Sequence, residues 1–277
     1  MTRQHTALLR LLNDDEPATW SLVKAELAGA GAARLEELRA LLDHATDPAA
    51  RHLREVIAGI EAREAGTLFA HYCAAFGEHG DIEDAAWRLA AAFLPGEDFA
   101  HPRALLESWA AEVARRLGKA RSGIDRIETL VEFLGHDVGL SGNEADYDNV
   151  NNSLLPEVIE TRQGIPITLS LVYLLVARRC GLEFDGVGLP AHFIIRSGAH
   201  FFDPFRGGRR LGMEDCRSIA ERHGFTLRPE HLQPVTSRQM LTRMLGNILA
   251  LARETDPPLA AKVSGWMEAL RAGEPPR

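Results

Sequence analysis

The sequence has few cysteines and no long apolar runs. Its 277 residues include three cysteines, Cys73, Cys180 and Cys216, and no two of them form a CxxC pair. This argues against a zinc knuckle or a disulfide framework and favours a reducing compartment, so we expect a cytoplasmic protein. No stretch of about 18 apolar residues occurs, and acidic residues come early in the chain. Neither a membrane span nor a signal peptide is therefore expected.

Basic residues are also too few to dominate the charge. Lys and Arg number 31 against 39 Asp and Glu, which gives a formal net charge of −8. An acidic chain does not offer the broad basic surface that nucleic-acid binding requires. We therefore expect protein or peptide partners, without nucleic acid or membrane, and the sequence leaves the oligomeric state open.

Residues 1–98 are expected to form a helical region. Residues 8–27 and 38–57 each contain a Leu-rich segment, an acidic turn, a Pro-Ala step and a second amphipathic segment. The two segments align at Pro17 and Pro48. This pattern fits either a short α-solenoid or plain helical hairpins.

The amino-acid composition changes in the middle of the chain. A polar loop rich in Gly, Asn and Asp covers residues 141–153, and Ser153 is expected to cap a short helix that begins at Leu154. The next helix is expected between Pro166, which suits a first helical turn, and Gly181, which suits the residue after a helix. It is apolar on nearly every side, so we expect it to be the buried central helix.

The rest of the chain returns to strands and then to helix. Strands are expected within residues 184–197 and 200–205. Residues 233–277 are expected to form a C-terminal helical hairpin. The order of helices, a central apolar helix, antiparallel strands and further helices predicts an α+β fold.

Four motifs carry a resemblance to a known family. NNS at 151–153, GIPI at 164–167, GLPAHF at 188–193 and DPFRGG at 203–208 are together similar to the SirB-type transglutaminase-like family. This family is the core 2 branch of the transglutaminase/papain-like superfold, found in many bacteria and in some eukaryotic F-box proteins. The resemblance implies that residues 99–232 form a papain-like core, with a central helix packed on a small antiparallel sheet.

The resemblance also implies a catalytic geometry. In active members a cysteine at the start of the central helix is the nucleophile, and the free N–H groups of the helix stabilise its thiolate. A histidine takes the proton and an aspartate orients the histidine. The motifs assign these two roles to His192 and Asp203. The cysteine position falls at about Pro166, which has no nucleophile.

Other residues are weaker candidates for the nucleophile. Ser170 lies one turn deeper than Pro166 on the same helix face, although a mid-helix serine commonly bonds to the carbonyl four residues earlier. Cys180 lies about 21 Å along the helix from its start. Cys73 and Cys216 approach the site only if tertiary contacts bring them there.

A metal site is not expected. His192, His200 and Asp203 are close in sequence, but residues 200 and 203 point to opposite faces of a regular strand. We therefore expect no metal and no other cofactor.

The lining of the cleft is expected to come from the polar loop and from the motifs. Tyr147, Asn151 and Asn152 are placed at the cleft mouth, and the Asn152 amide is a candidate for meeting a bound carbonyl. Arg162 is a candidate for bidentate contact with a carboxylate. Pro166 of the GIPI motif and Phe205 of the DPFRGG motif complete the expected lining.

Three functions are compatible with these features. The favoured one is a non-catalytic transglutaminase-like protein, a pseudoenzyme that binds a protein or peptide partner through the former active-site cleft and the helical region. The alternative is a hydrolase or acyltransferase of the peptidase or amidase type. It would use His192 and Asp203 with water or Ser170, since general-base action alone contributes about 10²–10⁴-fold. The third is a helical scaffold in which the core is only a spacer.

Overall fold

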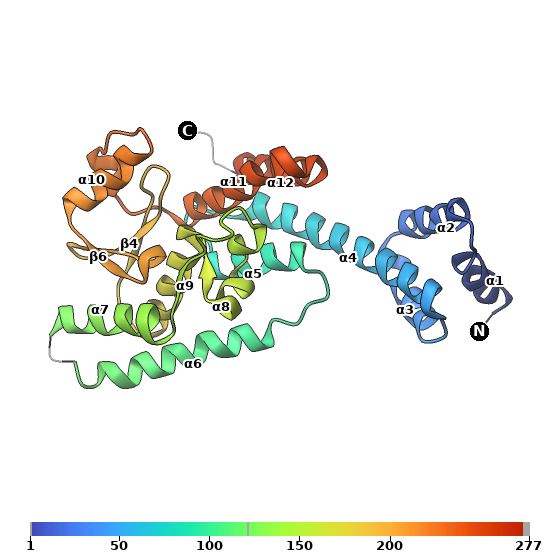
Figure 1. Ribbon diagram of the computed structural model, residues 1–277, viewed down its shortest axis with the longest axis horizontal. Coiled ribbons are helices and arrows are strands. Elements are labelled where there is room, and N and C mark those ends of the chain that lie inside the picture. Colours follow the sequence, from blue (N-terminus) through green and yellow to red (C-terminus); the bar gives the residue numbers. More distant parts are fainter. Residues whose placement is uncertain (1, 121, 274–277) are drawn as a thin grey trace. The chain divides into compact units, whose positions relative to one another are not determined.

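The computed structural model describes residues 2–120 and 122–273 (Figure 1). Its contacts divide the chain into two compact units. The first comprises the described residues up to Phe69 together with Ala91–Glu97, and the second comprises Ala70–Ala90 and the described residues from Asp98 onward. Within the described ranges, no helix is long and apolar enough to cross a membrane.

This division differs from the expected boundaries at 98/99 and 232/233. Residues 70–90 pack with the second unit because Glu83 is paired there with Arg178 and Arg179. The C-terminal helices also belong to the second unit, where Arg238 donates a hydrogen bond to the Phe76 carbonyl at 2.7 Å.

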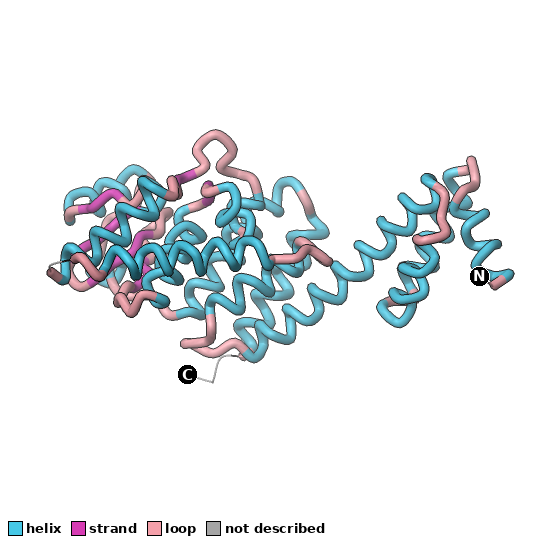
Figure 2. Tube along the Cα trace, turned by 90° about the horizontal axis from the view of Figure 1, so that it is seen from below, coloured by secondary structure: helices cyan, strands magenta, loops and turns pink. Residues whose placement is uncertain are grey.

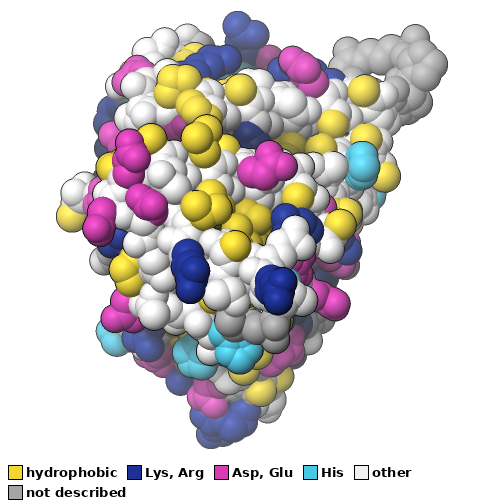
Figure 3. Space-filling view, turned by 90° about the vertical axis from the view of Figure 1, so that its right-hand side faces the viewer, with side chains coloured by type: hydrophobic (Ala, Val, Ile, Leu, Met, Phe, Trp, Pro, Cys, Tyr) yellow, Lys and Arg dark blue, Asp and Glu magenta, His cyan; other side chains and the backbone are white. Residues whose placement is uncertain are grey.

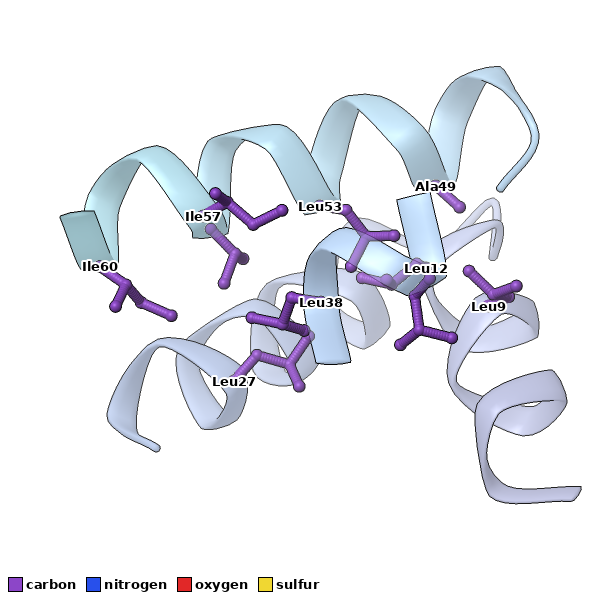
Figure 4. Close-up of a cluster of buried hydrophobic side chains, with 10 residues drawn as sticks. Leu9, Leu12, Leu27, Leu38, Ala49, Leu53, Ile57 and Ile60 are labelled. Carbon is purple, nitrogen blue, oxygen red and sulfur yellow. The ribbon is translucent and has the colours of Figure 1, made fainter. Parts of the chain in front are cut away.

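The first unit contains the two expected helix pairs. They are α1 (Arg3–Leu12) with α2 (Pro17–Gly29), and α3 (Leu35–Leu42) with α4 (Asp47–Ala75), and a 3₁₀ turn at Ala32–Arg34 separates the pairs. Pro17 and Pro48 each lie in the first turn of the second helix of a pair, where a missing N–H is harmless. Both pairs contribute to one apolar cluster (Figure 4), whose buried members are Leu9, Leu12, Leu27, Leu38, Leu41, Ala49, Leu53, Val56, Ile57 and Ile60.

The second unit is built around α9. Its helices are α5 (Ile82–Phe93), α6 (Ala100–Leu117), α7 (Gly123–Glu132), α8 (Leu155–Thr161), α9 (Pro166–Arg179), α10 (Met213–Arg222), α11 (Ser237–Thr255) and α12 (Pro257–Ala272). The end of α4 from Ala70 also belongs to this unit, whereas the end of α5 from Ala91 belongs to the first. Figure 1 shows α9 inside this unit, and α6, α8, α11 and strands of both small sheets pack against it. Eleven of its 14 residues are buried. The helix starts at Pro166 and is followed by Gly181 at φ +64°, as the sequence predicts.

Two small sheets accompany α9. The larger is an antiparallel meander of β3 (Asp185–Val187), β4 (Ile194–Ser197), β5 (His200–Asp203) and β6 (Arg209–Leu211), whose strands are coloured magenta in Figure 2. β1 (Ser141–Gly142) and β2 (Gln163–Gly164) form a parallel pair. Helices packed on a small antiparallel sheet confirm the α+β fold class.

The remaining short elements connect these layers. They are a π-helix (Phe133–Asp137) after α7 and 3₁₀ turns at Val150–Ser153, Pro204–Arg206 and Pro229–Leu232. α11 and α12 pack against each other as the expected hairpin. On the face of the molecule in Figure 3, side chains of both charge signs lie among hydrophobic ones, so neither sign dominates that face.

The expected cap at Ser153 is wrong. α8 begins at Leu155 after Leu154, and no side chain caps it. The Ser153 hydroxyl is buried and has no hydrogen-bond partner in the described chain. The polar loop instead uses Asn149, whose Oδ1 accepts from the Asn151 N–H at 2.9 Å and caps the 3₁₀ turn before α8. The extra turn moves Ser153 out of the capping position.

Candidate functional site

A cavity of about 430 Å³ opens at the start of α9. The loop before α8, the first turn of α9, the turn before β4, the end of β5 and the end of α10 all contribute to it. Its lining residues are Glu144, Tyr147, Pro166, Ala191, His192, Asp203, Phe205, Arg206, Ile219, Arg222 and His223. The segments that carry the sequence motifs therefore meet around one hollow.

His192 and Asp203 form a hydrogen-bonded pair in this cavity. His192 Nε2 lies 3.0 Å from Asp203 Oδ1, and the two side chains are 13% and 5% exposed. Asp203 Oδ1 also accepts from the Phe205 N–H at 3.1 Å. Because the carboxylate accepts from Nε2, the neutral imidazole carries its proton there and its lone pair is at Nδ1. Within the described chain, Nδ1 has no hydrogen-bond partner, so it is available to a ligand or to water.

His192 lies in a tight turn, whereas the sequence places it on a strand. β4 begins only at Ile194, and the His192 N–H donates to the Leu189 carbonyl at 3.1 Å. Pro190 and Ala191 are the central residues of this turn, and Ala191 has φ +57°. A left-handed conformation costs a non-glycine residue about 1–2 kcal/mol. The backbone next to the histidine is therefore strained.

The position expected for a nucleophile is occupied by Pro166. It is the first residue of α9 and lines the cavity together with His192. None of the described lining residues carries a thiol or an aliphatic hydroxyl group. The structure therefore places a histidine–aspartate pair beside a helix N-terminus without a cysteine, serine or threonine nucleophile in the lining.

Residues 100–246 match the family model of the transglutaminase-like superfamily. The chain belongs to this superfamily. The match covers the cavity segments and extends into α11. The finer SirB-type assignment stays a prediction.

Relatives with similar sequences occur in bacteria and in mammals. The chain is 37% identical over 134 residues to a UPF0162 protein of Xylella fastidiosa, which covers 45% of this chain and 48% of that protein. It is 30% identical over 185 residues to a UPF0162 protein of Pseudomonas aeruginosa, and the aligned region covers 65% of this chain and 67% of that protein. It is 33% identical over 124 residues to F-box only protein 21 of Mus musculus, and the aligned region covers 40% of this chain and 19% of that protein. The chain thus spans about half the length of the first of these relatives, and no solved structure matches it.

Ser170 does not join the pair in this transglutaminase-like domain. Its side chain is fully buried in α9 and does not line the cavity. Its hydroxyl has no hydrogen-bond partner in the part of the chain that the structure describes, so the expected bond to the carbonyl four residues earlier is not formed.

The three thiols are unsuited to nucleophilic attack. Cys73 and Cys216 are fully buried, and burial raises their pKa values to about 12 and about 11. The negative charges of Asp215 and Asp203 add to the raised pKa of Cys216, which is not among the lining residues of the cavity. Burial also raises the pKa of Cys180, whose Sγ donates to the Ala110 carbonyl at 3.4 Å.

Two of the expected cleft residues form an aromatic wall. The Tyr147 and Phe205 rings meet edge to face at 6.0 Å, and the Phe205 ring meets the His192 ring edge to face, also at 6.0 Å. Burial raises the pKa of Tyr147, although its side chain is still partly exposed. Both rings line the cavity with Pro166.

The asparagines do not present free amides to the cavity. Asn152 is buried, and its Nδ2 donates to the Asp146 carbonyl at 2.6 Å and to the Tyr147 carbonyl at 3.2 Å. Its Oδ1 accepts from Asn143 at 3.0 Å. Asn152 therefore braces the loop that carries Tyr147. Asn151 is exposed and is not among the lining residues.

Arginines other than Arg162 line the cavity. Arg162 is exposed, ends α8 in a left-handed conformation at φ 62° and is not a lining residue. Arg206 and Arg222 line the cavity instead. Arg206 is paired with Glu144 at 2.7 Å, whereas Arg222 has no ion pair among the described residues. Arg206 belongs to the DPFRGG motif but was not singled out as a lining residue. No local signal in the sequence marks Arg222, because the end of α10 reaches the cavity only through the fold.

No metal cluster is present in the described ranges. No group of three His, Cys, Asp or Glu side chains there is close enough to hold an ion. His200 Nδ1 instead meets Arg210 Nη2 at 2.8 Å, so this ring is engaged by a cation.

Sequence reasoning missed Arg243 on α11. It donates hydrogen bonds to the backbone carbonyls of Leu189 and His192 at 3.1 and 3.0 Å. It lies 51 residues from His192, in a helix expected to belong to a separate hairpin.

Proposed function

We propose that this chain is a non-catalytic transglutaminase-like protein that binds a peptide segment of a partner protein in the cavity at the start of α9. The observation that carries the proposal is Pro166 at the nucleophile position, beside a histidine–aspartate pair that is otherwise complete. Without a cysteine, serine or threonine in the lining, the cavity keeps the histidine–aspartate pair but has no side chain to form an acyl intermediate.

The cavity offers three kinds of contact to a peptide. His192 Nδ1 is a hydrogen-bond acceptor, Tyr147 and Phe205 provide apolar surface, and Arg222 is a cation without an ion pair in the described chain. An arginine recognises a carboxylate through two parallel N–H bonds. These contacts favour a peptide with an acidic side chain, or a C-terminal carboxylate, next to an apolar side chain.

The size of the cavity agrees with this occupant. A volume of about 430 Å³ lies in the range of about 300–1,000 Å³ typical of small-ligand pockets, so it accommodates a few side chains and not a folded domain. The helical first unit adds exposed Leu11 and Leu22, at 43% and 73%, as surface for further contacts with the same partner.

A second function is favoured by one observation, the intact pair itself. A neutral His192 with its lone pair at Nδ1 is arranged as a general base, and water is a sufficient nucleophile for slow hydrolysis. In that case Asp203 would orient the ring, and Ser170 would take no part because it is buried away from the cavity.

The test is selection from a displayed random peptide library by the purified full chain. We expect selected peptides rich in Asp and Glu. His192→Ala and Arg222→Gln should each weaken binding at least tenfold by calorimetry. Arg217→Gln is the matched control, since Arg217 lies on the same helix, is paired with Glu214 and does not line the cavity.

The same peptides distinguish binding from catalysis. After long incubation, mass spectrometry should show them intact. Cleavage or acyl transfer that disappears in His192→Ala and Asp203→Ala would overturn the non-catalytic proposal in favour of the hydrolase. Failure of every peptide to bind would overturn the peptide-binding proposal.

A further inference from the structure

Arg243 reaches from α11 to the turn that carries His192. Its Nη1 donates to the Leu189 carbonyl at 3.1 Å and its Nη2 donates to the His192 carbonyl at 3.0 Å. These carbonyls belong to the first and last residues of the four-residue turn, whose ends are also joined by the His192 N–H. One guanidinium therefore clamps both ends of the turn.

The Arg243 guanidinium loses part of its hydration when it makes these contacts, because it is partly buried. Burial lowers the pKa of Arg243, so its charge is held in surroundings that disfavour it. In the described chain no carboxylate forms an ion pair with it, and the backbone carbonyls are its hydrogen-bond acceptors. Arginine suits this task because its planar fork carries five donors and spans two acceptors at once, which a lysine ammonium does not do.

The turn needs such a clamp because its backbone is strained. Ala191 sits at φ +57°, a left-handed conformation that is unfavourable for a residue with a side chain. Relaxation of Ala191 would rotate the peptide that leads into His192. The ring would then leave Asp203, because His192 lies outside β4 and no strand pairing holds it.

The same guanidinium lies close to the aromatic wall. Its positive charge opposes the rise in the Tyr147 pKa that burial causes. Arg243 thus stands near both the loop that carries Tyr147 and the turn that carries His192.

We propose that Arg243 is the positioning residue of this site. It fixes the turn 189–192 so that His192 Nε2 meets Asp203 and Nδ1 faces the cavity. This role is independent of whether the cavity binds a peptide or hydrolyses one, because it concerns the state of the ring alone.

The test is the rate at which the His192 Nε2 proton exchanges with water. The full chain and its variants are labelled with ¹⁵N-histidine and studied by NMR at one mildly alkaline pH. The His192 signal is assigned by its loss in His192→Ala. We expect Arg243→Met to accelerate the exchange at least tenfold, because the bond to Asp203 opens more often. Arg243→Lys should give an intermediate rate, since an ammonium reaches one carbonyl at a time.

Arg238→Met is the matched control. Arg238 lies on the same helix, is buried and also donates to a backbone carbonyl, that of Phe76, which is not part of the turn. Its replacement should lower the stability but leave the His192 exchange rate unchanged. If circular dichroism shows that Arg243→Met does not fold, the exchange rate in Arg243→Lys is used for the comparison instead. Exchange in the Arg243 variants no faster than in Arg238→Met would overturn the proposal.

Discussion

His192 Nε2 lies 3.0 Å from Asp203 Oδ1, although continuing the β4–β5 register would set Ile194 and not His192 opposite Asp203. The register pairs Ile195 with Phe202, and His192 comes before the strand begins. The pair therefore depends on the turn before β4 and on the contacts that hold that turn.

Pro166→Cys should create a reactive thiol. The introduced side chain would lie at the N-terminus of α9 and in the same lining as His192, and both features lower the pKa of a thiol below its ordinary value of about 8.5. The rate of alkylation by iodoacetamide, followed against pH by mass spectrometry, should report a thiol pKa below about 7.5. The native thiols provide a low background, because burial raises their pKa values.

The matched control is the double variant Pro166→Cys with His192→Ala. Its thiol pKa should move back toward about 8.5, because only the helix N-terminus remains to stabilise the thiolate. Equal alkylation profiles in the single and double variants would show that position 166 does not face His192.

Asp203→Ala should lower the free energy of unfolding by about 2–3 kcal/mol. The carboxylate is buried and accepts from both His192 Nε2 and the Phe205 N–H, and the substitution leaves both donors without that acceptor. Asp203→Asn retains an acceptor oxygen and should cost about 1 kcal/mol. Urea unfolding followed by circular dichroism measures both. Equal stability of the alanine variant and the unmodified chain would contradict the structural role of the carboxylate.

Gly135→Ala should be strongly destabilising. A Cβ at this position in the π-helix would lie 1.9 Å from the carbonyl oxygen of Gly207, just after the turn that begins at Asp203. Backbone must move to relieve this contact, and we expect a loss of about 3 kcal/mol in thermal or urea unfolding.

Gly246→Ala is the comparison for this glycine. Gly246 lies within α11, and nothing is within 4 Å of its added Cβ. Alanine should therefore stabilise the protein by about 0.5–1 kcal/mol through its better helix propensity. Similar effects of the two substitutions would argue against the close approach at Gly135.

Glu83→Gln should lower the free energy of unfolding more at neutral pH than at acidic pH. Burial tends to raise the pKa of Glu83, but its bonds to Arg179 and Trp87 and the charge of Arg178 outweigh burial and lower it. A carboxyl whose folded pKa is depressed adds stability above its unfolded pKa of about 4.3, and this stability is lost as the pH falls through the folded value.

The expected cost at pH 7 is about 1–3 kcal/mol. This is less than the about 3–5 kcal/mol typical of a broken buried pair, because Arg178 is half exposed. Urea unfolding of both proteins between about pH 7 and pH 3 should show the difference shrinking below about pH 4. A difference that is constant with pH would show that Glu83 acts by packing and not by charge.

The sequence predicted those features whose causes are local. The limits of α9 follow from Pro166 and Gly181, which start and stop a helix through their own backbone properties. The fold class follows from the order of elements. The closeness of His192 and Asp203 was implied by the family resemblance.

Features that depend on tertiary contacts could not be predicted in this way. Arg222 reaches the cavity from the end of α10, and Arg243 reaches the turn that carries His192 from α11. No motif marks either residue. Arg162 is near the motifs but its left-handed backbone at the end of α8 leaves it outside the lining. Asn152 has the right side chain for ligand recognition, yet the loop carbonyls occupy its amide.

The order of the strands has a consequence for synthesis of the chain. β3 to β6 are neighbours in sequence as well as in space, so each hairpin can close with little entropic cost as soon as its second strand leaves the ribosome. Asp203 and His192 are then already present, but α11 has still to be made. A nascent chain released before Arg243 emerges would contain the histidine and its carboxylate without the side chain that locks them together.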